Sequence, residues 1–84
     1  MADFNPSNYD KFTLMGVKTR EENGEFIATA PVGVVDAEYY VLECINTFTG
    51  AEYLLTFPTK DPLEALEFIG MNAHINECGI EKLY

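Results

Sequence analysis

The chain contains few of the residues from which metal and cofactor sites are built. Its 84 residues include one histidine, two cysteines and no tryptophan, and its six glycines are scattered rather than gathered into a phosphate-binding loop. A structural zinc site needs three or four Cys or His ligands. Cys44, His74 and Cys78 offer neither a C-x-x-C pair nor a second histidine. We therefore expect no bound metal and no cofactor.

A catalytic centre is equally hard to assemble from these residues. A nucleophilic Cys or Ser needs a His base and an orienting acid. His74 is the only imidazole, and Cys78 follows it four positions later on the same predicted helix. No segment predicts a buried cleft that would raise the pKa of a carboxylate for acid–base work. We expect no enzyme; an enzyme or small-molecule binder would need a pocket beside His74 and Cys78.

Long apolar runs and a secretory signal are also missing. The segment from Met1 to Pro6 has neither the basic region nor the apolar run of such a signal. No apolar run approaches the ~20 residues that a membrane-spanning helix needs. Two cysteines do not form a disulfide framework. The expectation is a cytoplasmic protein with no membrane partner.

Basic residues are scarce, and their distribution is uneven. The formal net charge is −9, and no Lys or Arg occurs from Glu21 to Thr59. Between Glu21 and Glu81 twelve acids face a single base, Lys60. Such a charge repels DNA, RNA and anionic membranes, so we expect no direct nucleic-acid binding and instead attraction to basic proteins. Solubility alone is the competing explanation for an acidic composition.

The segment from Glu38 to Phe57 predicts the central hairpin of the fold. It concentrates β-branched, aromatic and leucine residues in two runs that flank the turn Thr47–Gly50. Side chains alternate between the faces of a strand, and a slip of one residue would bury Glu43 and Glu52. The predicted inward residues are Tyr40, Leu42, Cys44, Ala51, Tyr53, Leu55 and Phe57.

A first hairpin is predicted upstream. Phe12–Thr19 and Glu25–Ala30 are strand-like and flank Asn23-Gly24, a pair suited to a type I′ turn. Gly16 indicates a bulge or a close backbone approach, and Pro31 ends the second strand or places it at an edge. The apolar segment 31–36 is expected to pack against the body.

The C-terminal third predicts a helix from Pro62 to about Glu77. Asp61 is a suitable N-cap, Pro62 suits the first helical position and Glu64 complements the dipole. The residues expected on the sheet-facing stripe are Leu63, Leu66, Ile69, Gly70 and Ala73. Gly79 ends the helix, and residues 80–84 can add a short strand.

The expected fold class is therefore α+β in one small domain over residues 1–84, with residues 1–10 as an N-terminal arm or loop. The sheet is antiparallel with four or five strands in the order ββββα, and one helix packs on one face.

The outward face of the central hairpin is the predicted contact surface. Tyr39, Val41, Glu43 and Ile45 lie there beside Glu52, Leu54 and Thr56. Apolar and aromatic groups among acids are typical of a protein interface, with Tyr as an anchor. The alternatives are that segment 31–36 or the N-terminal arm covers this face, or that two copies bury it together.

In size and charge alone, the chain resembles the small acidic inhibitors that bacteriophages make against host nucleases, restriction enzymes and CRISPR effectors. This resemblance involves no particular residue. It implies a non-enzymatic inhibitor of a basic, nucleic-acid-handling protein, in the host cytoplasm if phage-encoded. Carboxylates two apart on a strand stand about 6–7 Å apart, a spacing that allows imitation of a phosphate backbone.

The predicted partner-binding residues are Glu21, Glu22, Glu25, Asp36, Glu38, Tyr39, Val41, Glu43, Glu52 and Leu54. The alternative function is a small homo-oligomeric structural or assembly subunit, which would make the protein a homodimer.

Overall fold

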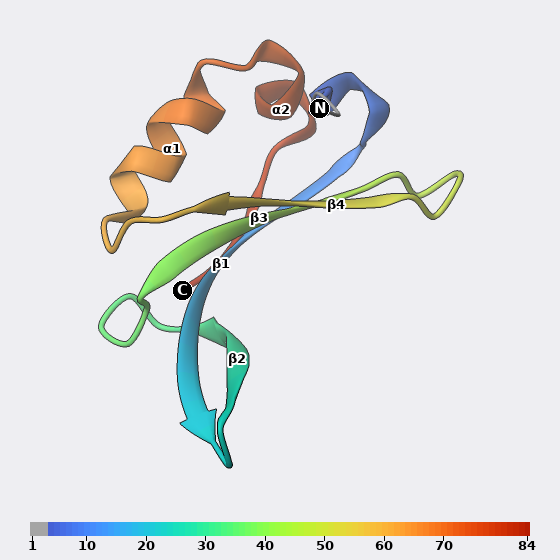
Figure 1. Ribbon diagram of the computed structural model, residues 1–84. Helices are drawn as coiled ribbons and strands as arrows, with labels where there is room; N and C mark the ends of the chain where they lie inside the picture. Colours follow the sequence, from blue (N-terminus) through green and yellow to red (C-terminus); the bar gives the residue numbers. More distant parts are fainter. Residues whose placement is uncertain (1–3) are drawn as a thin grey trace.

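A computed structural model describes residues 4–84, and within them a five-stranded sheet carries helices on one face (Figure 1). The elements, in chain order, are the 3-10 turn η1 (Pro6–Asn8), β1 (Lys11–Glu22), β2 (Glu25–Val32), β3 (Tyr39–Ile45), β4 (Glu52–Phe57), α1 (Pro62–Gly70), α2 (Ala73–Cys78) and β5 (Glu81–Leu83). This is the expected α+β class, including the short C-terminal strand.

Strand β1 is the central strand of the sheet and pairs with three other strands. The order is β2-β1-β3-β4, with β5 also paired to β1. The first half of β1 pairs antiparallel with β3 and parallel with β5, whereas its second half pairs antiparallel with β2. The β3–β4 hairpin extends the sheet on the far side. The sheet is therefore mixed at one short strand and antiparallel elsewhere.

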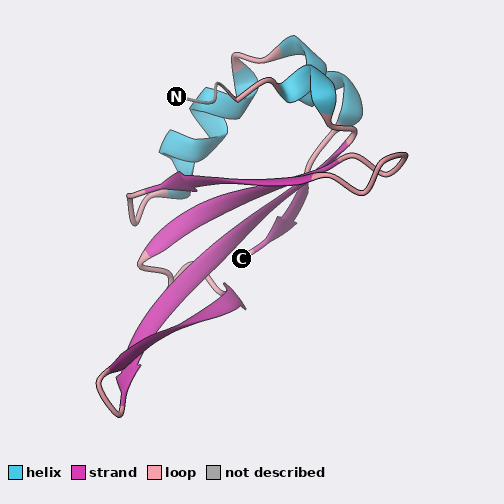
Figure 2. Cartoon of the chain, turned by 45° about the vertical axis from the view of Figure 1, so that its right-hand side comes forward, coloured by secondary structure: helices cyan, strands magenta, loops and turns pink. Residues whose placement is uncertain are grey.

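The far part of the β1–β2 hairpin projects from the body as a two-stranded arm (Figures 1 and 2). Its turn contains Asn23 at φ 54° and Gly24 at φ 80°, the positive values that a type I′ turn requires. Every residue from 21 to 31 is exposed. The predicted turn is confirmed, and the arm contributes nothing to the core.

Gly16 lies where β1 changes neighbours. A Cβ at this position would stand 2.5 Å from the carbonyl oxygen of Val32 and 3.0 Å from the Cβ of Ala37. The β1–β2 register shifts between Gly16 and Lys18. The close backbone approach predicted at this glycine is thus confirmed, and the β1–β2 pairing is irregular beside it.

The core lies between the sheet and the helices. The alternation predicted for β3 is confirmed, because Tyr40, Leu42 and Cys44 are fully buried. In β4, Tyr53, Leu55 and Phe57 pack against that core, while Ala51 precedes the strand and is exposed. The other buried members of the cluster are Phe12, Leu14, Ala37, Ala65, Ile69 and Ile75.

The helical segment is divided in two, where the sequence suggested one helix to about Glu77. Asp61 caps α1 by accepting from the Leu63 N–H at 2.9 Å, as predicted. A second cap follows, since the Asn72 side chain accepts from the Ile75 N–H at 3.0 Å and starts α2. Of the predicted sheet-facing stripe, Leu66 and Ile69 contact the core, whereas Leu63 is 60% exposed and Gly70 and Ala73 are exposed as well. Gly79 ends α2 at φ 77°, as expected.

The segment 31–36 packs down only in part, although the whole segment was expected to do so: Val32 lies against the core, whereas Val34 and Val35 are exposed. Pro31 and Val32 belong to β2, and the chain then turns so that the Asp36 and Ala37 N–H groups both donate to the Gly33 carbonyl. The turn directs Val35 to solvent at 94% exposure. The N-terminal arm does dock, with Phe4 stacked on Tyr53 at 5.0 Å on the helix side of the sheet.

Candidate functional site

The sheet face opposite the helices is open, and we call it the outer face (Figure 2). Directly paired residues share a face, so the register assigns its members. Of the two segments that were expected as possible covers, the described part of the N-terminal arm packs on the helix side through Phe4, and segment 31–36 packs against the core through Val32 and exposes Val35. The outer-face residues of the central strands, of which Thr13 and Val17 are buried by their neighbours, are Lys11, Thr13, Met15, Val17, Tyr39, Val41, Glu43, Ile45, Glu52, Leu54 and Thr56.

An apolar groove of about 240 Å³ crosses the outer face. Leu54 is 60% exposed, and Tyr39 and Val41 are half-buried. The complete lining is Met15, Val17, Ala28, Ala30, Tyr39, Val41, Glu43 and Leu54. Four predicted partner-binding residues thus meet in one groove, and Glu43 is its only charged group.

Acids flank this groove on two sides. In the strand register, Glu43 lies opposite Leu54, and Glu52 lies opposite Ile45 toward the β3–β4 turn. Glu21 pairs with Phe26 on the arm. Lys11, opposite Ile45, occupies the same face and offsets part of the negative charge at that end. The acidic character of the outer face is therefore strongest around Glu43 and toward the arm.

The remaining predicted acids lie away from the groove. Glu25 adjoins the tip of the arm, and Asp36 is exposed in the β2–β3 loop. Glu22 sits 3.1 Å from the Arg20 guanidinium, and both side chains are more than half exposed. The structure does not bring these three acids together with Tyr39 and Leu54.

Glu38 has a structural role of its own. Its carboxylate accepts hydrogen bonds from the backbone N–H and the hydroxyl of Thr19. These bonds lower the pKa of Glu38, and the positive charges of Lys18 and Lys60 lower it further. The carboxylate is already engaged by the fold, which leaves less of it for a partner.

A second hollow, of about 430 Å³, lies between the start of β1 and the end of α2. It is lined by Cys78 but not by His74. The Nε2 of His74 lies 2.6 Å from the Tyr9 carbonyl oxygen and 3.6 Å from the Cys78 sulfur. A ring nitrogen that donates its proton to a carbonyl has no lone pair left to accept the thiol proton. The pair is therefore not arranged as a nucleophile and its base.

Neither metal binding nor membrane spanning finds support in the described residues. Across residues 4–84, no group of three or more His, Cys, Asp or Glu side chains could hold a metal ion. The α1 and α2 helices are too short to cross a membrane, and no other helix in that range could do so.

Four lining residues of the groove were not singled out from the sequence. Met15 and Val17 come from β1, and Ala28 and Ala30 from β2. Their alternation was visible, since Met15 and Val17 share one face of the first strand and the two alanines share one face of the second. What joins them to Tyr39 is the strand order, with β1 between β2 and β3.

Comparison with known proteins adds no further constraint to this geometry. No protein-family model, no curated protein and no solved structure matches the chain.

Proposed function

We propose that this protein is a non-enzymatic binding module that docks on another protein through its outer face. The observation that supports the proposal is the open groove, whose lining includes exposed Leu54, half-buried Tyr39 and the acid Glu43. Interfaces combine an apolar, aromatic centre with a polar rim. A sheet face that no helix or second sheet covers is otherwise expected to be polar.

The proposed partner is a basic protein that handles nucleic acid, of the nuclease, restriction-enzyme or CRISPR-effector type, and binding inhibits it. The net charge of −9 favours encounter with such a surface. Glu21, Glu43 and Glu52 provide acids on the outer face itself. These acids would occupy the sites where the partner binds phosphates, and Leu54 and Tyr39 would anchor the contact.

The test is quantitative binding to captured candidate partners. The protein is used as bait in bacterial lysate at low salt, and the dissociation constant of each retained basic protein is then measured with purified components. Glu43→Lys and Leu54→Ser are expected to weaken binding about tenfold or more, because one reverses a charge and the other removes an anchor. Glu67→Lys is the matched control, since it makes the same charge change on the exposed side of α1.

Raising the salt concentration should also weaken binding, because exposed charges are screened. Binding that stays constant with salt, or that responds equally to Glu43→Lys and Glu67→Lys, would contradict the proposal.

A structural subunit whose outer face pairs with itself is the alternative. Charge disfavours this arrangement, because two such faces would bring Glu43 and Glu52 of one copy toward the same acids of the other. Leu54→Asp tests the self-pairing: if a dimer is joined through the outer face, this substitution should dissociate it into monomers.

A further inference from the structure

Strand β2 forms an open edge of the sheet. Among residues 4–84, its only strand neighbour is β1, and it lies at the end of the order β2-β1-β3-β4. All of its residues except Val32 are exposed. An edge of this kind presents backbone N–H and C=O groups that can pair with another strand.

The turn determines which backbone groups face outward. In a hairpin with a two-residue turn, the residues beside the turn form a hydrogen-bonded pair, and such pairs alternate along the ladder. Here Glu22 pairs with Glu25, Arg20 with Ile27 and Lys18 with Thr29. The backbone groups of Phe26 and Ala28 and the N–H of Ala30 therefore point away from β1, whereas the Ala30 carbonyl lies where the β1–β2 register shifts. Pro31, which lacks an N–H, is not among the outward donors.

The arm has too little packing of its own. A two-stranded hairpin without a covering layer is marginally stable in water. Phe26 is 79% exposed and Ile27 36% exposed. A third strand along β2 would pair the open backbone groups and cover part of both side chains.

We propose that β2 pairs antiparallel with β2 of a second copy, about a two-fold axis that passes beside Ala28. In this register Phe26 faces Ala30 of the second copy, and Ile27 faces its Thr29. Phe26 meets the small Ala30, and two β-branched side chains meet at Ile27 and Thr29. The Ala28 backbone groups pair with those of the second copy, and the Phe26 carbonyl accepts from the Ala30 N–H of that copy. The interface is isologous, since each contact occurs twice.

Charge also favours this segment for self-association. Two chains that each carry −9 repel one another, so contact between copies requires a region without acids. Residues 26–35 form the longest run of the sequence that lacks a charged side chain. In the proposed register no acid faces an acid, because Glu25 lies opposite Pro31 of the second copy.

The dimer is independent of the proposed partner binding. Alternation places Phe26, Ala28 and Ala30 on one side of β2, and the two alanines line the groove. Edge pairing would thus continue the outer face of one copy into that of the other. It would leave Leu54 and Glu43 uncovered, so either proposal can fail while the other holds.

Sedimentation velocity over a concentration series in the micromolar range tests the pairing. The unchanged protein should show a reversible monomer–dimer equilibrium. Ala28→Pro should raise the dimer dissociation constant about tenfold or more, because it removes one outward N–H from each copy. Ala28→Ser keeps the N–H and should leave the constant within about twofold. A protein that remains monomeric throughout, or that dimerises equally well with Ala28→Pro, would overturn the proposal.

Charge exchange at the axis tests the register without a proline. Ala28→Lys alone and Ala28→Glu alone should each weaken the dimer several-fold, since residue 28 faces itself and like charges repel across a strand pair. An equimolar mixture of these two variants should restore it. The same exchange at Thr29 is the control, because Thr29 faces Ile27 and the two Thr29 residues lie only diagonally across the axis, so a mixture should restore the dimer less than at Ala28. Rescue at Thr29 but not at Ala28 would overturn the register, and far-UV circular dichroism confirms that each variant is folded.

Discussion

The carboxylate of Glu38 binds Thr19 twice, through the backbone N–H and, at 2.9 Å, through the hydroxyl. The β1–β3 ladder ends at the pair Val17 and Tyr39, and the Glu38 N–H still donates to the Val17 carbonyl at 2.8 Å. The Glu38 carboxylate thus accepts from the Thr19 N–H in place of the backbone carbonyl that a longer β3 would have provided. This contact holds the base of the arm at Thr19, just beyond the end of the β1–β3 ladder.

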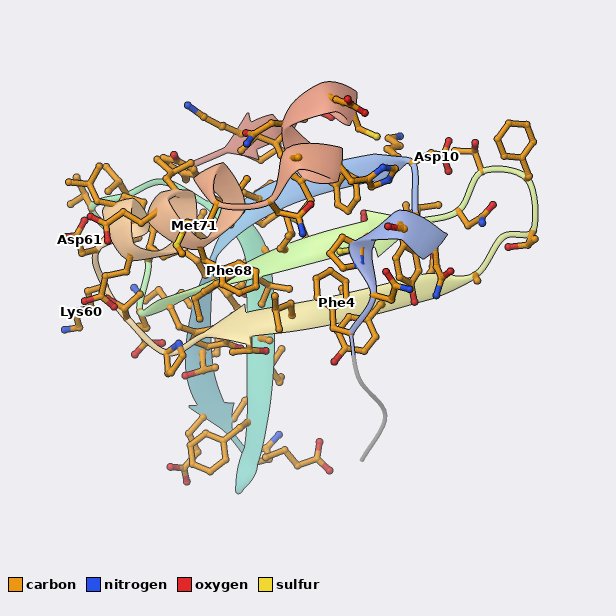
Figure 3. All side chains as sticks on the ribbon, turned by 90° about the horizontal axis from the view of Figure 1, so that it is seen from above. Phe4, Asp10, Lys60, Asp61, Phe68 and Met71 are labelled. Atoms are coloured by element: carbon orange, nitrogen blue, oxygen red, sulfur yellow. The ribbon has the colours of Figure 1, made fainter. Side chains whose placement is uncertain are left out.

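The stability of the protein should fall in acid through two carboxylates. Hydrogen bonds from Thr19 lower the pKa of Glu38, and hydrogen bonds from Thr47 lower that of Asp10 (labelled in Figure 3). Both folded-state pKa values lie below the ordinary values of 4.5 and 3.8. Their contribution is therefore complete above about pH 5 and is lost as the pH falls through the folded-state values.

Urea unfolding at a series of pH values from about 7 to about 2.5 measures this effect. Glu38→Gln combined with Asp10→Asn should be less stable near neutral pH and show a flatter acid decline. Glu67→Gln makes the same chemical change at an exposed helical position and should keep the original curve. Parallel acid declines for the double variant and the unchanged protein would contradict the assignment.

Tyr40→Phe should stabilise the fold. The Tyr40 side chain is fully buried, and its hydroxyl has no hydrogen-bond partner among the described residues. An unsatisfied buried hydroxyl costs about 1–3 kcal/mol, and its removal leaves the ring and its edge contact with Tyr84 in place. We expect the free energy of unfolding to rise by about 1 kcal/mol, measured by urea denaturation. A fall of similar size would show that the hydroxyl is satisfied.

Gly16→Ala should destabilise the fold by about 1–3 kcal/mol, since the added methyl would collide with the Val32 carbonyl oxygen and the β1–β2 pairing would have to yield. Gly33→Ala is the matched control, because a Cβ there meets no atom within 4 Å. Thermal unfolding of both variants separates the two cases. Equal melting temperatures would mean that the approach at Gly16 relaxes without cost.

The two thiols should react at very different rates. Cys44 is fully buried, and burial raises its pKa to about 11, so at pH 8 only about one thiol in a thousand is ionised. Cys78 is exposed. Iodoacetamide should label Cys78 alone in the native protein and both residues in denaturant, as measured by peptide mass spectrometry. Equal native labelling would show that the core around Cys44 opens readily.

Local features of the fold could be predicted because their causes are local. The positive φ values at Asn23 and Gly24 follow from a turn that few other residue pairs tolerate. The burial of Tyr40 and Leu42 follows from the two-residue period and from the cost of burying Glu43.

Strand order and the helix break could not be predicted in the same way. Alternation tells which face a side chain occupies but not which strand lies beside it, so the place of β1 next to β3 was open. The break before α2 depends on the Asn72 side chain, which caps the second helix. The sequence is equally compatible with Asn72 inside one long helix. Val35 was expected to pack because it is apolar, yet the turn at Gly33 directs it outward.

The candidate site was likewise predictable only where its residues come from a single hairpin. Tyr39, Val41 and Leu54 could be placed on one face from their own hairpin. The contributions of Met15 and Ala28 depend on the strand order. The sequence also could not show that Glu22 lies beside Arg20 or that Glu38 is held by Thr19, since both depend on side-chain positions in the folded chain.

The pairing of β5 with β1 has a consequence for how the chain is made. During translation Thr13–Met15 of β1 leave the ribosome well before Glu81–Leu83, which complete one of the edges of β1 and follow it only after the other three strands and both helices. Until then the backbone of Thr13 to Met15 has an unfilled side. The nascent polypeptide can close its two hairpins early, yet its sheet is finished only after both helices and β5 have been synthesised.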